Sequence, residues 1–310
     1  MTLSYSGWKT YQHCQRKWLY SSVIKAPRTK DAYRKEVGIL SNLQSIDAWR
    51  GEIVDFTISN FIIRGLNKDI CYTLEDSIKY AKEICRKRYD FAKSKRYRGK
   101  EVVKSHHLEE YSALFDVEFG KGLKTEDFKR AWNDIETSLK NFFNNHELIE
   151  TLEDEDNMLI AQRPLHLKID GFKIKGIPDL IIFNEHKPPR IIDWKVHYSG
   201  NKTYNEQLLI YALALSKSMH KDFPNYIKKF DVLEYQLSEY QLLINEHRKY
   251  PVTEEYLEET ESFLIESAYQ LHLAGGDVKF DKIEFENFEI TNQPENCLTC
   301  PYHKICCNDN

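Results

Sequence analysis

Cysteines at both ends of the chain restrict how it can fold. Cys14 stands alone near the N-terminus, whereas Cys297, Cys300 and Cys306 form a C-x2-C-x5-C run near the C-terminus. Thiolates at such spacings bind either zinc or an iron–sulfur cluster, and the spacing alone does not distinguish the two. If one metal centre binds all four, the two ends of the chain must meet. Cys307 follows Cys306 directly, so we expect it to point elsewhere as a spare thiol.

Length and composition indicate a folded, water-soluble protein. The chain has 310 residues, of which 41% are hydrophobic and 30% charged, enough for one large domain or two small ones. No apolar run approaches the ~20 residues that cross a bilayer, and the first residues do not resemble a secretory signal. We therefore expect a cytoplasmic location without a membrane partner. Cysteines stay reduced there, so clusters of them favour metal over disulfides.

The hydrophobic periodicity predicts helices in the first half and a sheet in the second. Apolar positions at helical spacing cover 4–24, 33–65 and about 70–150. Strands are predicted at 158–169, 172–174, 179–183, 190–194, 230–237 and 241–243, with helices at 204–219 and 253–273 and a loop-like tail. This order predicts an α/β fold, a small mixed sheet flanked by helices. We expect a core formed by 1–64 and 151–310, with 65–150 as a helical insertion and possible DNA-binding lobe.

Two carboxylates and a lysine lie on neighbouring predicted strands. Asp179 opens one apolar strand, and Asp193 ends the next, with Lys195 two residues later on the same face. Carboxylates bind Mg²⁺ beside a phosphate, and a nearby lysine can orient the attacking water. The following helix presents Gln207 and Tyr211 at i and i+4. The alternative to a catalytic role is that the two aspartates and the lysine are solvated charges at the edge of a sheet, and that Gln207 and Tyr211 are ordinary packing residues of the helix.

These motifs resemble those of PD-(D/E)XK nucleases of the RecB and Cas4 type. The similar segments are Gly176-Ile177-Pro178-Asp179, Asp193-Trp194-Lys195, Gln207-x3-Tyr211, the helix around Cys14, and the cysteine-rich tail, which together span 1–60 and 155–307. The resemblance implies a restriction-endonuclease-like core and a Mg²⁺- or Mn²⁺-dependent deoxyribonuclease. It also implies metal binding by Asp179, Asp193 and the backbone carbonyl of Trp194, with catalysis by Asp179, Asp193, Lys195, Gln207 and Tyr211. A [4Fe–4S] cluster on Cys14, Cys297, Cys300 and Cys306 is favoured over zinc.

One position departs from the family pattern. The family has a metal-binding His at the end of an R-G-x-x-(V)-H motif, and the matching stretch here begins at Arg50-Gly51 and ends at Asp55. Aspartate is also a metal ligand, harder than imidazole, so we interpret Asp55 as a substitute ligand. Loss of the site is the main alternative. His106 or His107 could instead supply an imidazole.

A basic segment stands out in a chain whose net charge is −4. Residues 82–104 contain ten Lys or Arg against three acidic residues. Positive side chains interleaved with aromatic ones are typical of single-strand binding, although a solvated helix face is equally compatible. The expected DNA-contacting residues are Arg86, Lys87, Arg88, Lys93, Lys95, Arg96, Arg98 and the adjoining Lys100.

The sequence therefore favours a DNA nuclease acting on single-stranded or end-bearing DNA. Its role could lie in repair, CRISPR adaptation or antiviral defence, with a helicase, integrase or defence-system partner. The alternative is a catalytically impaired DNA-binding subunit of a helicase–nuclease or recombination complex.

Overall fold

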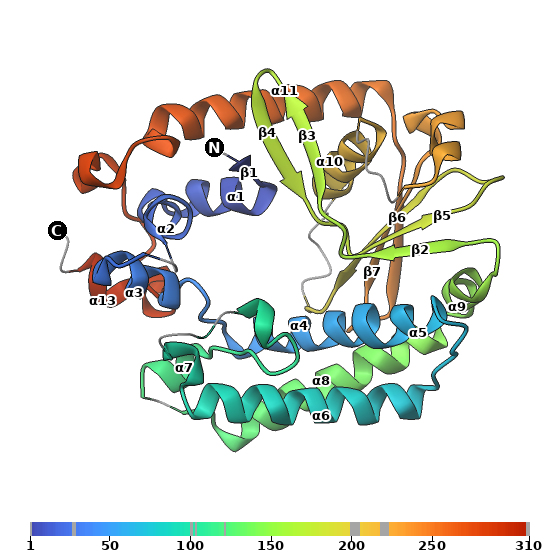
Figure 1. Cartoon of the computed structure of the whole chain (residues 1–310), viewed down its shortest axis with the longest axis horizontal. Coiled ribbons are helices and arrows are strands. Elements are labelled where there is room, and N and C mark those ends of the chain that lie inside the picture. The colour runs from blue at the N-terminus through green and yellow to red at the C-terminus, as the bar shows by residue number, and fades with distance from the viewer. Residues whose placement is uncertain are drawn as a thin grey trace. The chain divides into compact units, whose positions relative to one another are not determined.

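The computed structural model describes residues 2–26, 29–99, 102, 104–120, 122–198, 205–217 and 223–307. The chain forms two compact units, each assembled from separate stretches of sequence (Figure 1). Unit 1 comprises Met1–Ile46, Arg86–Lys124 and Leu264–Asn310, and unit 2 comprises Asp47–Cys85 and Thr125–Phe263. The segment 65–150, expected as a separate insertion, is thus divided between the two units. Two long helices, α6 (Leu74–Lys93) and α11 (Glu254–Leu271), belong partly to each.

Unit 2 is built on a five-stranded mixed sheet with the order β2-β5-β6-β7-β8. The strands are β2 (Met158–Ala161), β5 (Leu180–Phe183), β6 (Arg190–Lys195), β7 (Gln236–Gln241) and β8 (Glu246–Tyr250). Neighbouring strands are antiparallel except β6 and β7, which are parallel. A parallel pair needs a crossover connection, and α10 (Asn205–Ser216) lies in this one. The expected mixed α/β architecture is confirmed.

A hairpin precedes β5. Strands β3 (Leu165–Ile169) and β4 (Phe172–Gly176) pair in antiparallel register. The turn residues Asp170 and Gly171 both have positive φ, 45° and 80°, as a two-residue hairpin turn requires. The predicted turn is confirmed, but the predicted strand 158–169 is two strands. The break falls at Gln162, whose φ is 51°, shortly before Pro164, which has no N–H for a ladder.

The helices of unit 2 hold the sheet-borne residues in place. α4 (Ile46–Thr57) continues through a π-helical turn (Ile58–Ile63) into α5 (Arg64–Leu66), and α8 (Thr125–Asn144) is followed by α9 (His146–Glu153). Arg50 of α4 donates to Asp134 of α8 at 2.5 Å and to the Val196 carbonyl at 3.0 Å, with both side chains of the ion pair buried. This contact joins two helices to the end of β6.

Unit 1 combines the two ends of the chain. Its first part contains β1 (Thr2–Leu3), α1 (Tyr5–His13), α2 (Gln15–Trp18), a π-helical turn (Leu19–Ile24) and α3 (Ala32–Leu40). Its other elements are short: 3-10 turns at Arg96–Arg98, Lys104–His106, Phe280–Lys282 and Phe285–Asn287, a π-helical turn at His272–Gly276, and α7 (Phe115–Glu118), α12 (Glu295–Leu298) and α13 (His303–Cys306). Tyr20 packs on Tyr302 with ring centroids 5.0 Å apart, so the N-terminal and C-terminal segments share one core.

Several predicted elements differ from the structure. The predicted helix 4–24 is interrupted at Cys14, which has extended backbone angles. The predicted strand 230–237 begins later: Val232–Glu234 is a 3-10 turn closed by a capping box of Asp231 and Glu234, and β7 starts only at Gln236. Strand β8 was not predicted, since its sequence is polar and it lies at the sheet edge. The predicted helix ends at Tyr204 and Met219 fall outside the described residues. Among described residues, no helix is long and apolar enough to span a membrane.

Candidate active site

One pocket of unit 2 gathers the predicted catalytic residues. It is lined by Asp55 from α4, Asp179 before β5, Asp193, Trp194 and Lys195 from β6, and Gln207 and Tyr211 from α10. Asp193 is buried, whereas Asp55 and Asp179 are half-buried at the pocket wall. Segments separated by more than 100 residues therefore meet around one small volume, and the predicted face of β6 carries both Asp193 and Lys195.

Asp55 and Asp179 share one hydrogen-bond donor. The Gln162 amide nitrogen donates to Asp55 Oδ1 at 2.9 Å and to Asp179 Oδ1 at 3.0 Å. The backbone N–H of Gln162 also donates to the Asp179 carbonyl, at 3.0 Å. Gln162 was not singled out from the sequence; its one signal is the break in strand alternation before Pro164. The shared donor therefore brings these two carboxylates together at the pocket wall.

The carboxylate of Asp179 is held on both of its oxygens. Besides the bond from Gln162, its Oδ2 accepts the backbone N–H of Trp194 at 2.7 Å. A backbone donor does not swing away as a side chain does, so β6 fixes the orientation of the Asp179 carboxylate just before β5. The aspartate is therefore pre-positioned by the ladder that pairs Leu180 with Ile192.

Lys195 is placed by two oxygen partners. Its Nζ lies 2.5 Å from Asp193 Oδ2 and 3.2 Å from Gln207 Oε1. Gln207 Nε2 in turn donates to the Tyr211 hydroxyl oxygen at 2.5 Å. These contacts connect the end of β6 to the first turns of α10. Gln207 thus contacts both Lys195 and Tyr211, and the i, i+4 spacing brings the two α10 side chains together as expected.

The three carboxyl groups of the pocket resist ionisation. Desolvation raises the pKa of Asp55 to about 6, and the charges of Glu52 and Asp193 add to this, against the bonds from Ser59 and Gln162. Desolvation likewise raises the pKa of Asp179, reinforced by Asp193 and Asp55. For Asp193, desolvation raises the pKa while Lys195 opposes it and Glu239 assists it. Closely spaced carboxylates with unfavourable mutual charge are suited to a divalent cation, which removes that repulsion.

The donor set fits a hard cation. The pocket offers carboxylate oxygens and no thiol or imidazole from the described residues except His197. Mg²⁺ and Mn²⁺ prefer oxygen and usually keep several waters. In the described part of the chain no three His, Cys, Asp or Glu side chains already surround one metal position. The side chains would thus need water or substrate phosphate to complete a coordination shell. His106 and His107, the other candidate imidazoles, belong to unit 1.

The four predicted cluster cysteines line one cavity of unit 1. Cys14 contributes from the junction of α1 and α2, and Cys297, Cys300 and Cys306 from the tail. Burial raises the pKa of the Cys300 thiol, and Cys14 and Cys297 add to this effect. Burial also raises the pKa of Cys306 to about 11, again with Cys14 and Cys300 contributing. These four described cysteines thus line one cavity, although no three of them are arranged as a metal site.

Two further observations refine this cavity. All described cysteines are free of disulfides. Cys307 also lines the cavity, although its position next to Cys306 predicted that it would point elsewhere, and its Sγ lies 3.9 Å from His303 Nδ1. The cavity therefore holds five thiols, one more than the proposed cluster requires.

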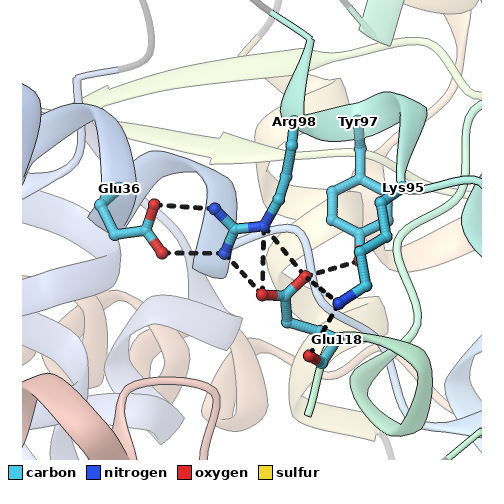
Figure 2. A network of polar contacts seen from close by, with 5 residues as sticks. All are labelled: Glu36, Lys95, Tyr97, Arg98 and Glu118. Carbon is cyan, nitrogen blue, oxygen red and sulfur yellow. Dashed lines mark hydrogen bonds and ion pairs between the residues drawn. The ribbon is translucent and has the colours of Figure 1, made fainter. Parts of the chain in front are cut away.

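The basic segment is partly used inside unit 1. Figure 2 shows Arg98 in a bidentate pair with Glu36, at 2.9 and 3.0 Å, and in contact with Glu118, which also accepts from Tyr97. Lys95 donates to the Glu118 carbonyl at 3.1 Å. These contacts fasten the 3-10 turn Arg96–Arg98 to α3 and α7. Arg98 and Lys95 thus have a structural function whatever else they bind.

The remaining basic residues differ in accessibility. Arg88 is 1% exposed and donates to the Leu108 carbonyl, so we do not retain it as a DNA contact. Phe91 and Tyr97 are buried in the core with Tyr111, which corrects the expectation that these rings stack on bases. Lys87 pairs with Glu109 and Arg96 with Glu110. Arg86 and Lys93 are exposed, and Lys100 lies outside the described residues.

The mixed sheet and a neighbouring helix thus bring three acids and a lysine together in one pocket. The sequence profile of the PD-(D/E)XK nuclease superfamily matches residues 2–307. The chain therefore belongs to the PD-(D/E)XK nuclease superfamily. No curated protein sequence matches it.

Two solved structures show distant similarity. One is the crystal structure of SSO0001, with 15% identity over 60% of this chain and 79% of the other, at a TM-score of 0.30. The other is a "Putative exonuclease" from Eubacterium rectale, with 12% identity over 84% of this chain and 89% of the other, at a TM-score of 0.32. Likeness at this level adds nothing to the family assignment.

Proposed function

We propose that this protein is a Mg²⁺- or Mn²⁺-dependent deoxyribonuclease of the RecB and Cas4 type. The observation that carries the proposal is the convergence of Asp55, Asp179, Asp193 and Lys195 in one pocket of a PD-(D/E)XK chain. Single-stranded or end-bearing DNA is the proposed substrate, and repair, CRISPR adaptation or antiviral defence the proposed setting.

The pocket residues have separable proposed roles. The cation would be held by Asp55, Asp179, Asp193 and the backbone carbonyl of Trp194. When bound, such a cation polarises the phosphate and lowers the pKa of a bound water. Lys195 would orient the attacking water and stabilise charge on the phosphate oxygens. Gln207 keeps the lysine amine aimed into the pocket by accepting its hydrogen bond.

Substrate binding is proposed to use the exposed part of the basic segment. Arg86, Lys93 and Arg96 are exposed and would contact phosphates, with Lys87 and Lys95 beside them. Because Phe91 and Tyr97 are buried and Tyr89 is half-buried, this contribution would be mainly electrostatic. Binding should accordingly weaken as salt increases.

The cysteine cavity is proposed to hold a [4Fe–4S] cluster on Cys14, Cys297, Cys300 and Cys306. The support is that the four thiols line one cavity, where burial, with a smaller contribution from neighbouring thiols, raises the pKa of Cys300 and of Cys306. Such a cluster would have a structural role, joining the first helices to the tail within unit 1.

Cleavage assays with two pocket variants test the nuclease. Wild-type protein is incubated with linear single-stranded, linear double-stranded and circular DNA, with Mg²⁺, Mn²⁺ or a chelator. We expect cation-dependent degradation that Asp179→Ala and Lys195→Ala each reduce by at least ~100-fold. Lys168→Ala, an exposed lysine on β3, is the matched control and should retain full activity.

The outcomes separate the nuclease from its alternative. Undiminished cleavage by Asp179→Ala would show that the chemistry occurs elsewhere. Cation and DNA binding by a wild-type protein that never cleaves would instead favour the impaired DNA-binding subunit. That outcome has some basis in the structure, since Asp55 replaces the family's histidine and is bonded to Gln162.

A further inference from the structure

A second buried carboxylate lies beside the pocket without lining it. Glu239, in the middle of β7, is fully buried. It pairs in parallel register with Asp193 of β6, and Gln241 pairs with Lys195. The proposed nuclease mechanism gives neither Glu239 nor Gln241 a role.

Strand geometry places Glu239 on the same face as Asp193. In-register residues on neighbouring strands point to the same side, with the strands ~4.8 Å apart. The row Asp193–Glu239 therefore continues onto β8, where Glu239 is in register with Arg248. Two acids in the interior of the sheet thus stand next to each other, with a cation at each end: Lys195 beside Asp193 and Arg248 beside Glu239.

The carboxylate of Glu239 is held in place by three neighbouring side chains. It accepts from Gln241 Nε2 at 2.5 Å and from the Tyr250 hydroxyl at 3.2 Å, and Arg248 Nη1 lies 3.6 Å away. Gln241, itself fully buried, leaves its Oε1 without a hydrogen-bond partner among the described residues. Burying a carboxylate and an unsatisfied amide is unfavourable compared with an apolar pair of the same size. Packing alone would not select these residues.

We propose that Glu239 is a positioning residue that strengthens divalent-cation binding at Asp193. The inference deepens the proposed nuclease and rests on it. A fixed negative charge one strand behind the ligand attracts the cation through the low-dielectric interior of the sheet. Its bonds to Gln241 and Tyr250 hold Glu239 back, so it acts through Asp193 and does not bind the ion itself. The positive charge of Arg248, which lies on the β8 side of Glu239, weakens the attraction of Glu239 for the cation.

Calorimetric titration of metal-free protein with Mn²⁺ tests the inference. We expect Glu239→Gln to weaken Mn²⁺ binding by about tenfold, because the substitution keeps the shape and removes the charge. The Mn²⁺ concentration for half-maximal DNA cleavage should rise in parallel, while the rate at saturating Mn²⁺ stays within about twofold of wild type. Glu155→Gln, an exposed glutamate of the same unit, is the control and should bind as wild type does.

A second variant gives a change of opposite sign. Arg248→Gln removes the moderating cation, so Mn²⁺ should bind severalfold more tightly, an effect that a purely structural role would not produce. This variant decides the matter if Glu239→Gln fails to fold. An Mn²⁺ affinity unchanged in both variants would overturn the inference while leaving the nuclease intact. A wild-type protein that binds no Mn²⁺ and cleaves no DNA would overturn the nuclease itself.

Discussion

Gly176 illustrates how closely single residues are constrained around the pocket. A Cβ at this position would lie 2.7 Å from Tyr211 Cδ1 and 2.8 Å from its Cε1. The tyrosine ring therefore packs directly on the backbone that leads to Asp179. The glycine of the Gly-Ile-Pro-Asp motif is required by this close approach, at the end of β4.

Gly176→Ala should consequently destabilise the protein. We expect the free energy of unfolding to fall by about 1–3 kcal/mol, because the added methyl must displace the Tyr211 ring or the strand. Denaturant unfolding followed by circular dichroism measures the change. Gly51→Ala is the control: its Cβ would lie 3.9 Å from Val196, and alanine in the interior of α4 should be neutral or stabilising. Equal effects of the two substitutions would contradict the packing argument.

Residues whose role follows from local spacing could be predicted from the sequence. Asp193 and Lys195 are two residues apart on one strand and so share a face, and Gln207 and Tyr211 are about one helical turn apart. Each pair is therefore in contact, as expected. Gln162 could not be found this way, because its importance depends on contacts with a helix 107 residues earlier in the chain. The burial of Arg88 was equally invisible in a run of charges.

At the scale of elements, one ion-pair network joins three short segments. Arg98 of the 3-10 turn reaches Glu36 on α3 and Glu118 on α7 (Figure 2). Burial opposes ionisation of Glu118, but the hydrogen bonds from Arg98 and Tyr97 outweigh it, and the pKa lies below its usual value. The ionic contribution of Glu118 to this network is therefore present only while Glu118 is charged.

The lowered pKa of Glu118 determines how the stability of the folded protein changes with pH. A carboxyl group whose pKa is lower in the folded state contributes stability above its unfolded value of ~4.3 and loses it as the pH falls further. We expect Glu118→Gln to lower the melting temperature at pH 7 and the difference from wild type to shrink below about pH 4. Asp116→Asn, on the same short helix, is the control. A difference that does not vary with pH would contradict the network's ionic contribution.

Elements with strong apolar patterns were predictable, and those fixed by tertiary contacts were not. β5 and the first half of β6 are apolar and were predicted nearly to the residue, as was α11. β8, with the sequence Glu-His-Arg-Lys-Tyr, has no apolar alternation, and only its pairing with β7 makes it a strand. Local propensity does not encode that pairing.

At the scale of the whole molecule, each unit contains one candidate site. The acidic pocket belongs to unit 2 and the cysteine cavity to unit 1. The sequence predicted that the two ends meet if one metal centre binds the four cysteines. Tyr20 and Tyr302 do pack together within unit 1, whereas the centre itself stays a proposal. The division into two units was not predictable, because both units combine segments far apart in the sequence.

Cys300→Ser should therefore affect the two sites differently. We expect loss of iron and of visible absorbance in anaerobically purified protein, together with a lower melting temperature, because a ligand of the proposed cluster is removed. Mn²⁺ binding by the same preparation should persist, since the acidic pocket belongs to unit 2. Cys71→Ser, an exposed cysteine of unit 2, is the control. Zinc in place of iron in the wild-type protein would contradict the cluster assignment.

The carboxamide of Gln162 has a consequence for how an ion could arrive. Its one nitrogen donates to Oδ1 of both Asp55 and Asp179, two of the residues that are proposed to hold the cation. A cation held by these two residues would compete with the Gln162 amide for their oxygens, so the carboxamide would have to turn away or present its own oxygen. The selectivity of the site among cations would then depend partly on how readily each cation displaces the Gln162 carboxamide.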